Sequence, residues 1–553
     1  MSDSPAPSSF VRHAKIIGVI TFVSRILGLV REMIVAHYFG PSSVLSAFKY
    51  AFVLPNLFRK LLGEGALSAA FIPLYTKSLK ETDGDSHRHF ASAAVSLQLV
   101  ILVAITVVAE LILLATLYLA DLRLETALAL KLAIVMMPYV VFVCAAALLG
   151  GILQVHRRFV ATTATAVLLN ALMILAIILV ARRYDLTTEP GQREAVWWLA
   201  VSVLVAGAAQ VALLVPSLAR CGFRFQLTLH TWTPAVKRMM LMSLPVAMSL
   251  GVLQIGVVLD KQISLMMSPQ HAGETIGHFL GLWFRLPMEI GALARLDWAQ
   301  YLYQFPLGVF GIAIATAIFP QLSGDALGVD QKQFRAVLSR GIKAALFIGL
   351  PASVGMVLVA LPAVRLLFER GRFTVHDSHL TALSTAIYSS VIWAFSVQQI
   401  LNRAYYALHD MRTPLIWAII NLLINLVVEI PLLWWLGESA MAVGTLASFF
   451  VQTSVMSLLL CKRIGLPIGE LVPDTSKMIL ASVGMILPCA ALRWGVPWPD
   501  NGPGHALALL AIMSAGGVTY FSLCFALRLP MNALIPARLR RRQDFKTRLD
   551  NPR

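Results

Sequence analysis

The chain has 553 residues, of which 58% are hydrophobic and only 13% are charged. Because soluble domains carry roughly a quarter charged residues, this composition excludes an ordinary soluble protein and indicates one that crosses a membrane many times. The net charge of +17 is interpreted as a topology signal, since no nucleic-acid motif accompanies it. The five cysteines lie singly in or beside apolar segments, which predicts neither a disulfide framework nor a metal site.

Apolar segments of about 20 residues are long enough to span a bilayer. About fourteen such segments are centred near residues 26, 62, 104, 140, 170, 206, 250, 310, 348, 392, 424, 450, 485 and 515. The second is interrupted by Pro55, Gly63, Gly65 and Pro73, and interrupted helices often line transporter cavities. Lys and Arg are more frequent in the even-numbered breaks, which predicts that both termini, including the basic tail at residues 538–548, are cytoplasmic.

A weak internal repeat relates the two halves of the chain. AFIPLY (residues 70–75) is similar to AIFPQL (317–322), and LQVHRRF (153–159) is similar to ALHDMRTP (407–414). The offset of about 250 residues corresponds to six segments. Because six is even, the repeat predicts two parallel six-helix lobes with a cleft between them, followed by two further helices.

The first two segments carry charges where a membrane helix normally has none: Arg25, Arg31, Glu32, Lys49, Arg59, Lys60 and Glu64. Each ionisable group at bilayer depth costs about 2.5–3.5 kcal/mol, so such groups normally face a bundle interior or an aqueous cavity. Cations outnumber anions here, and arginine binds phosphate with two parallel hydrogen bonds. This predicts a cavity for an anion such as a lipid-linked pyrophosphate. The alternative is that Arg25 or Arg31 pairs with Glu32 or Glu64 and only ties helices together.

Further charged residues lie in later segments. Asp260 and Lys261 are adjacent in the seventh, where Asp260 is expected to neutralise a cavity arginine, bind a coupling cation, or form an interhelical ion pair. Arg403 belongs to the tenth. Asp410 and Arg412 are expected to cap a helix rather than contact a substrate.

Four motifs carry a family resemblance: SRILGLVRE (residues 24–32), LPNLFRKLLGEGALSAAFIPLY (54–75), LLFERGRFTVHDS (366–378) and RAYYALHDMRTP (403–414). Together they resemble the MurJ (MviN) family of lipid II flippases, within the multidrug/oligosaccharidyl-lipid/polysaccharide exporter superfamily. The resemblance covers roughly residues 12–465. It implies an all-α fold with two six-helix lobes around a central cavity and two carboxy-terminal helices. It also implies that Arg25, Arg31 and Arg59 are required for transport, and that Glu64 is the family's acidic EGA residue.

The sequence departs from the family pattern in two places. Ser46 stands where many members have aspartate, and Gln300, Tyr301 and Gln304 replace charged residues, so one expected substrate-binding arginine is missing. An unusually long stretch, residues 268–297, precedes this position. Of its arginines, Arg295 is the nearer candidate to substitute.

We therefore predict an amino-terminal lobe (residues 1–230), a carboxy-terminal lobe (231–465), two additional helices (466–530) and a basic tail (531–553). The predicted function is translocation of lipid II to the outer leaflet of the bacterial cytoplasmic membrane by alternating access. The predicted substrate site comprises Arg25, Arg31, Arg59, Lys60, Glu64, Asp260, Lys261 and Arg403. We expect no cofactor or metal, and coupling to the membrane potential or to a monovalent cation. The alternatives are export of another undecaprenyl-linked polysaccharide and, in a different class, an integral-membrane glycosyltransferase or acyltransferase.

Overall fold

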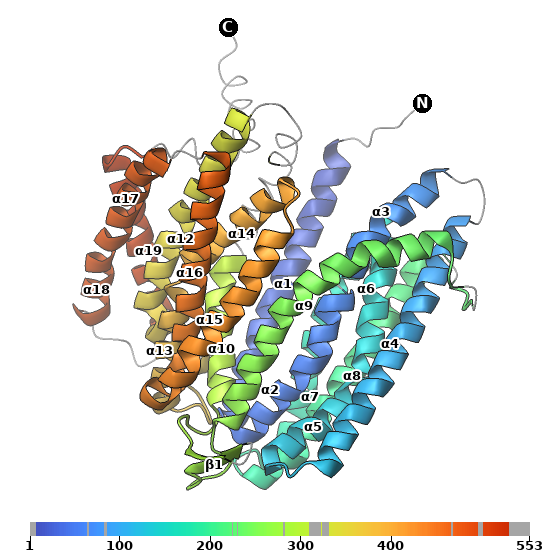
Figure 1. The fold of residues 1–553 in the computed structure, drawn as a ribbon. Helices are drawn as coiled ribbons and strands as arrows, with labels where there is room; N and C mark the ends of the chain where they lie inside the picture. The colour runs from blue at the N-terminus through green and yellow to red at the C-terminus, as the bar shows by residue number, and fades with distance from the viewer. Residues whose placement is uncertain are drawn as a thin grey trace. The chain divides into compact units, whose positions relative to one another are not determined.

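The computed structural model describes residues 7–63, 66–81, 86–223, 225–228, 231–279, 282–308, 322, 331–465, 468–495 and 502–529. Most of this described backbone is helical, and its two strands form one hairpin. Contacts divide the chain into two compact units: Met1–Ala294 with Arg370–Phe373, and Arg295–Glu369 with Thr374–Arg553. Figure 1 shows each of them as a bundle of long helices.

The first unit is organised around α6. Its elements are α1 (Pro7–Phe39), α2 (Ser43–Phe58), the π-helix η1 (Arg59–Gly63), α3 (Ala66–Glu81), α4 (Ser86–Leu119), α5 (Leu124–Met136), α6 (Tyr139–Val155), α7 (Phe159–Ala181), α8 (Glu189–Ala219), α9 (Pro234–Met266), β1 (Ile276–Phe279) and β2 (Leu282–Arg285). α6 packs against α3, α4, α7 and α8, and α7 also packs along α1. Buried apolar side chains of α3, α4, α6, α8 and α9 form the core.

The second unit is organised around α12, a helix of 38 residues. Its elements are α10 (Ala292–Pro306), α12 (Gln331–Phe368), α13 (Val375–Ser389), α14 (Ile392–Ala407), α15 (Arg412–Leu436), α16 (Ser439–Ile464), α17 (Ile468–Gly484), α18 (Ile486–Gly495) and α19 (Gly502–Ala526). α12 packs against α13, α14, α17, α18 and α19, while α15 packs along α16. The core joins α12, α14, α16, α17 and α19.

Threonine side chains begin several of these helices. Thr188 and Thr233 each accept a hydrogen bond from the backbone N–H three residues later, and a proline follows in the first turn. Thr374 and Asp377 form a reciprocal capping box at the start of α13. The polar breaks between the apolar segments thus define where these helices start.

The membrane-spanning helices confirm the predicted all-α polytopic class. Among the described residues, nine helices are long and apolar enough to cross a membrane, or eleven if the pairs α5–α6 and α13–α14 are each one bent span. The bends measure 43° and 41°. The predicted count of fourteen is not confirmed. The eighth predicted segment, near residue 310, lies largely outside the described residues. One copy of the repeat (317–321) and the basic tail also lie outside them.

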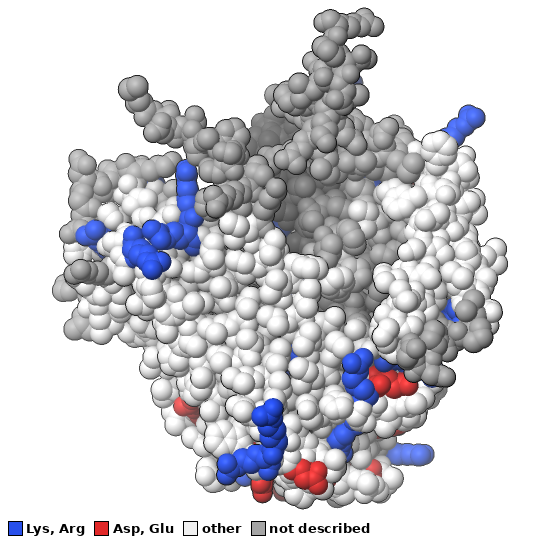
Figure 2. Space-filling model, turned by 180° about the vertical axis from the view of Figure 1, so that it is seen from behind, with Lys and Arg blue, Asp and Glu red and all other residues white. Residues whose placement is uncertain are grey.

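Apolar side chains cover the surfaces of these helices. On α4, Val100, Val103, Val107 and Leu111 recur every three or four residues and are all exposed. In Figure 2 most of the described surface seen from this side is uncharged, and Lys, Arg, Asp and Glu are confined to a few separate places. An apolar stripe that faces outward is typical of a helix surrounded by lipid.

The boundary between the compact units lies after Ala294, because α9 packs against α2 and α3 of the first unit. The predicted lobes, residues 1–230 and 231–465, are drawn from the internal repeat and the family resemblance, and not from contacts. Their boundary therefore stays a prediction.

The long stretch at residues 268–297 contains the antiparallel β1–β2 hairpin. Ile276 lies opposite Arg285, and His278 lies opposite Trp283. The ring centroids of His278 and Trp283 are 4.6 Å apart, and Trp283 is exposed. The middle of this long stretch thus forms a small hairpin, and its last residues, from Ala292, begin α10.

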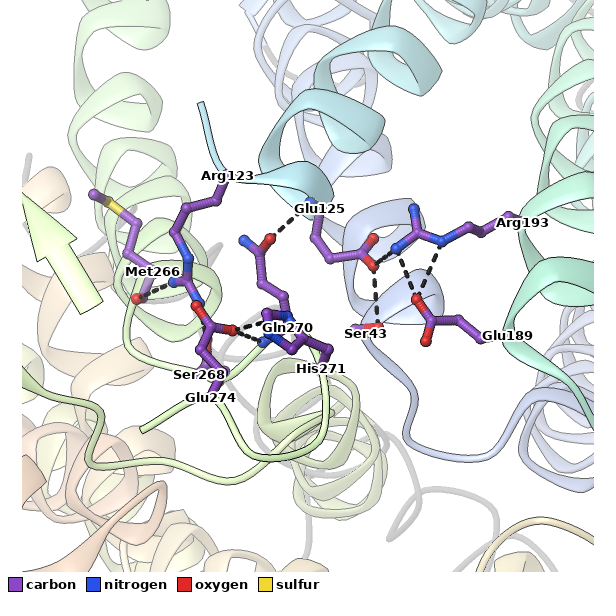
Figure 3. A network of polar contacts seen from close by, with 10 residues as sticks. All are labelled: Ser43, Arg123, Glu125, Glu189, Arg193, Met266, Ser268, Gln270, His271 and Glu274. Atoms are coloured by element: carbon purple, nitrogen blue, oxygen red, sulfur yellow. Dashed lines mark hydrogen bonds and ion pairs between the residues drawn. The ribbon is translucent and has the colours of Figure 1, made fainter. Parts of the chain in front are cut away.

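A polar network fixes the chain just before the hairpin (Figure 3). Arg123, between α4 and α5, donates hydrogen bonds to the carbonyls of Met266 (2.8 Å) and Ser268 (2.9 Å) and to Glu274 Oε1 (2.7 Å). The Gln270 side chain accepts from the Glu125 backbone N–H at 2.9 Å. These bonds hold the end of α9 against the start of α5.

The short segment Arg370–Phe373 of the LLFERGRFT motif also belongs to the first unit. The Arg372 N–H donates to the His37 carbonyl at 3.0 Å, at the end of α1. Gly371 has a φ of +64°, and a Cβ there would lie 2.3 Å from the His37 oxygen. Glycine is therefore required at this position both for its backbone conformation and for the close approach.

Candidate substrate cavity

The break in the second predicted span is a π-helical turn. α2 ends at Phe58, η1 covers Arg59–Gly63, and α3 begins at Ala66. Ser68 Oγ donates to the Gly63 carbonyl at 2.7 Å, which satisfies one backbone group that the wider turn releases. π-Helical turns occur frequently at functional sites. The predicted interruption is confirmed at Gly63, where η1 ends, and it sets the position of Arg59. Pro55 and Pro73 do not break the helices, because they lie inside α2 and α3.

A cavity of about 750 Å³ opens beside this turn. Its lining comes from α1, α2, η1, α3, α6, α7 and α8, all within the first unit. Arg31 and Arg59 contribute charge, and Asn56, Asn170 and Gln154 contribute neutral polar groups. Among the described lining residues there is no aspartate or glutamate. The cavity is therefore electropositive and suits an anionic group.

Arg31 is held in place by neighbours on three sides. Its guanidinium donates to Asn170 Oδ1 at 3.0 Å and Glu32 Oε1 at 2.7 Å, and one nitrogen lies 3.7 Å from Met173 Sδ. Glu32 also binds Lys49 Nζ at 3.2 Å. The ion pair left open as an alternative is thus present, but one carboxylate serves two cations. The group of three keeps a net positive charge, and Arg31 still lines the cavity.

Arg59 is oriented from within its own turn. Its Nε donates to Asn56 Oδ1 at 2.8 Å, and both residues line the cavity. Asn56 lies one helical turn before Arg59, so the π-turn and this hydrogen bond together orient the Arg59 guanidinium at the cavity wall. Arg31 and Arg59 are the two members of the predicted site that the structure brings to one cavity.

The other predicted site residues lie elsewhere. Arg25 is exposed on α1 and does not line the cavity, and neither does Lys60. Asp260 and Lys261 lie on α9, which packs against α2, η1 and α3. Arg403 belongs to α14 in the second unit. Glu64 lies outside the described residues.

Arg295 is not available to replace the missing family arginine. It is only 2% exposed, and its guanidinium binds Glu438 Oε2 at 2.6 Å and Asp377 Oδ1 at 3.0 Å. The expectation that Arg295 substitutes at the substrate site is therefore wrong, because two carboxylates already occupy its donors. It joins α10, α13 and the start of α16 instead.

Two of the other departures from the family pattern, Gln300 and Ser46, form neutral hydrogen bonds. Gln300 Nε2 donates to Tyr388 Oη at 3.3 Å, and the rings of Tyr303 and Tyr388 stack 5.2 Å apart. Ser46 is buried and donates to the Ser42 carbonyl at 2.9 Å. Nothing in these contacts restores the charge that the family pattern has at these positions.

Asp410 caps α15, as expected. It accepts hydrogen bonds from the backbone N–H groups of Arg412 (3.1 Å) and Thr413 (2.9 Å), and it pairs with Arg463. Burial raises the pKa of this carboxyl, but the bonds from Thr413 and Arg463 outweigh it and hold the pKa below its usual value. Its role is structural.

Sequence reasoning missed a buried carboxylate in the second unit. Glu429 on α15 is fully buried against α16, where Gly444 leaves room for it. Asn425 lies one turn earlier and its Nδ2 is 3.4 Å from Thr445 Oγ1. The available signal was a single acidic residue inside an otherwise apolar span of 25 residues. In the described residues no cluster of three or more His, Cys, Asp or Glu side chains suits a metal ion.

Comparison with known proteins identifies the family. The family model described as "Lipid II flippase MurJ" matches residues 35–497. The chain belongs to this MurJ family. A probable lipid II flippase MurJ from Rhizobium tropici is 30% identical over 88% of this chain and 86% of its own length. The lipid II flippase MurJ of Burkholderia cenocepacia is 25% identical over 92% and 94%.

Solved structures show that the MurJ fold extends over nearly the whole chain. A lipid II flippase MurJ in an inward closed conformation matches with a TM-score of 0.71 and 22% identity, covering 93% of this chain and 98% of that one. An inward-facing multidrug-resistance MATE transporter of the MOP superfamily matches less closely, with a TM-score of 0.61 and 14% identity over 82% of this chain. These structures support the fold, and the MurJ assignment rests on the sequence matches.

Proposed function

We propose that this protein translocates lipid II from the inner to the outer leaflet of the bacterial cytoplasmic membrane. The observation that carries the proposal is an electropositive cavity, lined by Arg31 and Arg59 and by no described acidic residue, in a member of the MurJ family. The two guanidinium groups would hold the pyrophosphate. The undecaprenyl tail would stay in the surrounding lipid while the head group enters the cavity.

The proposed cycle is alternating access between the lobes predicted at residues 1–230 and 231–465, with both termini cytoplasmic. Moving an anion out of a negatively charged cytoplasm gains about 2.3 kcal/mol per charge per 100 mV. The membrane potential could therefore drive net export, and the chain contains no Walker A sequence for nucleotide binding. Among the remaining members of the predicted site, Arg25, Glu64, Asp260, Lys261 and Arg403 would contact the substrate or balance charge at other stages. Lys60, which does not line the cavity, has no role in the proposed cycle.

The test is complementation. The resident lipid II flippase of a bacterial host is depleted, this chain is supplied, and both growth and surface exposure of lipid II are followed. Rescue with restored exposure supports the proposal. Failure of a correctly inserted, well-expressed chain would contradict it and favour another undecaprenyl-linked glycan, because neutral residues occupy positions 300, 301 and 304.

We further propose that Glu429 couples transport to a monovalent cation or a proton. A buried carboxylate beside Asn425 and Thr445 offers oxygen ligands within a membrane span, and ionisable residues in such positions commonly mark ion pathways. Glu429→Gln keeps the shape and removes the charge. We expect it to slow lipid II flipping on the order of tenfold, the size of effect that one coupling interaction commonly has.

The measurement compares flipping by the parent and by Glu429→Gln in vesicles with and without an imposed cation gradient. The parent is expected to respond to the gradient and the variant is not. If both respond equally, Glu429 only ties α15 to α16. Asn421→Ala, one turn before Asn425 on the same helix, controls for general disturbance of α15.

A further inference from the structure

A second cationic cavity lies in the other unit, among α12, α18 and α19. Its volume is about 190 Å³. Arg365, Arg493 and His505 line it together with Trp494 and two apolar residues of α12. No carboxylate is among the described lining residues. Two like charges facing one small cavity repel each other unless an anion or water lies between them.

All three basic residues lie at the ends of helices. Arg365 is three residues before the end of α12, Arg493 is two residues before the end of α18, and His505 is in the first turn of α19. α12, α17 with α18, and α19 are each long and apolar enough to span a membrane. Their ends therefore lie near the membrane surface, at the level of the lipid phosphates. Trp494 is exposed beside the cavity, as is typical of tryptophan at this level.

The two arginines also hold the helices around the cavity together. Arg493 donates to the Leu358 carbonyl, which ties α18 to α12. Arg365 pairs with Glu369 one turn later at 3.3 Å and lies 3.3 Å from His379 Nε2. Glu369 itself is not among the described residues that line the cavity, whereas both arginines and His505 are.

We propose that Arg365, Arg493 and His505 bind a phosphate group, and that its source is the headgroup of an anionic membrane lipid. Arginine forks match phosphate oxygens, and the start of α19 adds the positive end of a helix dipole. A lipid bound there would hold α18 and α19 against α12 at the membrane surface. The site is in the second unit and does not depend on the cavity of Arg31 and Arg59.

The test uses the full-length protein in detergent micelles, with bound lipid counted by native mass spectrometry as phosphatidylglycerol is added. Each basic residue near a membrane surface contributes about a fivefold change in affinity for anionic lipid. We therefore expect Arg365→Gln and Arg493→Gln each to weaken binding about fivefold, and the double variant about 25-fold. Phosphatidylcholine, whose headgroup has no net charge, is expected to bind the parent protein more weakly.

The matched control is a double variant of Arg182 and Arg183, two exposed arginines after the end of α7. They line neither the cavity of Arg31 and Arg59 nor the cavity of Arg365 and Arg493. An equal loss in Arg182→Gln/Arg183→Gln would overturn the proposal, because it would show only a general effect of charge. Unchanged binding in the Arg365/Arg493 double variant would do the same. If Arg493→Gln is poorly folded, the lipid binding of Arg365→Gln tests the proposal alone, because this variant keeps the hydrogen bond from Arg493 to Leu358.

A further arm adds inorganic phosphate in place of lipid. Binding of inorganic phosphate that requires both arginines, with no preference for phosphatidylglycerol over phosphatidylcholine, would identify a soluble phosphate as the ligand and overturn the lipid source. Phosphatidylglycerol binding that inorganic phosphate does not displace at matched concentration supports the headgroup.

Discussion

Arg295→Ala is expected to destabilise the protein by about 3–5 kcal/mol, because removing one partner from a buried ion group leaves the other charges uncompensated. Two carboxylates depend on this guanidinium, Glu438 at 2.6 Å and Asp377 at 3.0 Å. Thermal unfolding of the purified protein and its steady-state level in membranes would show the loss. Arg182→Ala, at an exposed site, is expected to leave both unchanged.

A double-mutant cycle separates this triad from general damage to α10. Asp377 also caps α13 through Thr374, so Glu438 is the cleaner partner. If the triad is the cause, Arg295→Ala/Glu438→Ala costs less than the sum of the single variants, by about 0.5–3 kcal/mol. Strict additivity would mean that the two side chains act independently.

Arg31→Ala and Arg59→Ala are each expected to lower the appearance of lipid II at the cell surface on the order of tenfold or more. Each removes charge-assisted hydrogen bonds worth about 1.5–3 kcal/mol apiece. Protein levels in the membrane, measured by blot, are expected to stay near those of the parent. Arg31→Lys keeps the charge without the planar fork, so an intermediate rate is expected from it.

Two further variants decide what the cavity arginines do. Lys60 is next to Arg59 but does not line the cavity, so Lys60→Ala is expected to transport nearly normally. An equal loss there would point to a general electrostatic requirement instead of a grip on phosphate. Arg25 matches a required family arginine although it is exposed in this conformation. A loss in Arg25→Ala as large as in Arg31→Ala would place it on the substrate path at another stage.

Local signals in the sequence predicted the features that depend on neighbouring residues. Gly63 predicted the interruption at which η1 forms, whereas α2 continues through Pro55. The charges of the first two spans predicted a cationic cavity. The sequence left Glu32 and Glu64 as two candidate ion-pair partners for Arg31. It could not decide between them, because the answer depends on how the first two spans pack. Arg25 was grouped with Arg31 because both are charged residues in the first span and both match family arginines. Neither fact tells which face of α1 is covered by another helix.

Features that depend on distant segments could not be predicted. Arg295 looked like a substitute for a missing arginine because its acidic partners are 82 and 143 residues away in the chain. Hydropathy alone counts α5–α6 and α13–α14 as one segment each. The bend between α5 and α6 falls at Pro138, which is a local signal, whereas no proline lies at the break between α13 and α14. Glu429 was visible as a charge in an apolar span, but its burial against Gly444 was not.

The triad of Arg295 also has a consequence for biosynthesis. Glu438 emerges from the ribosome 143 residues after Arg295, which at 5–20 residues per second is a delay of about 7–29 s. During this interval α10 carries an arginine whose two carboxylates have not both been made. The helix would therefore stay near water or the insertion machinery until α13 and the start of α16 arrive. Slowing translation between residues 295 and 438 would lengthen the period in which a half-made chain is open to proteolysis.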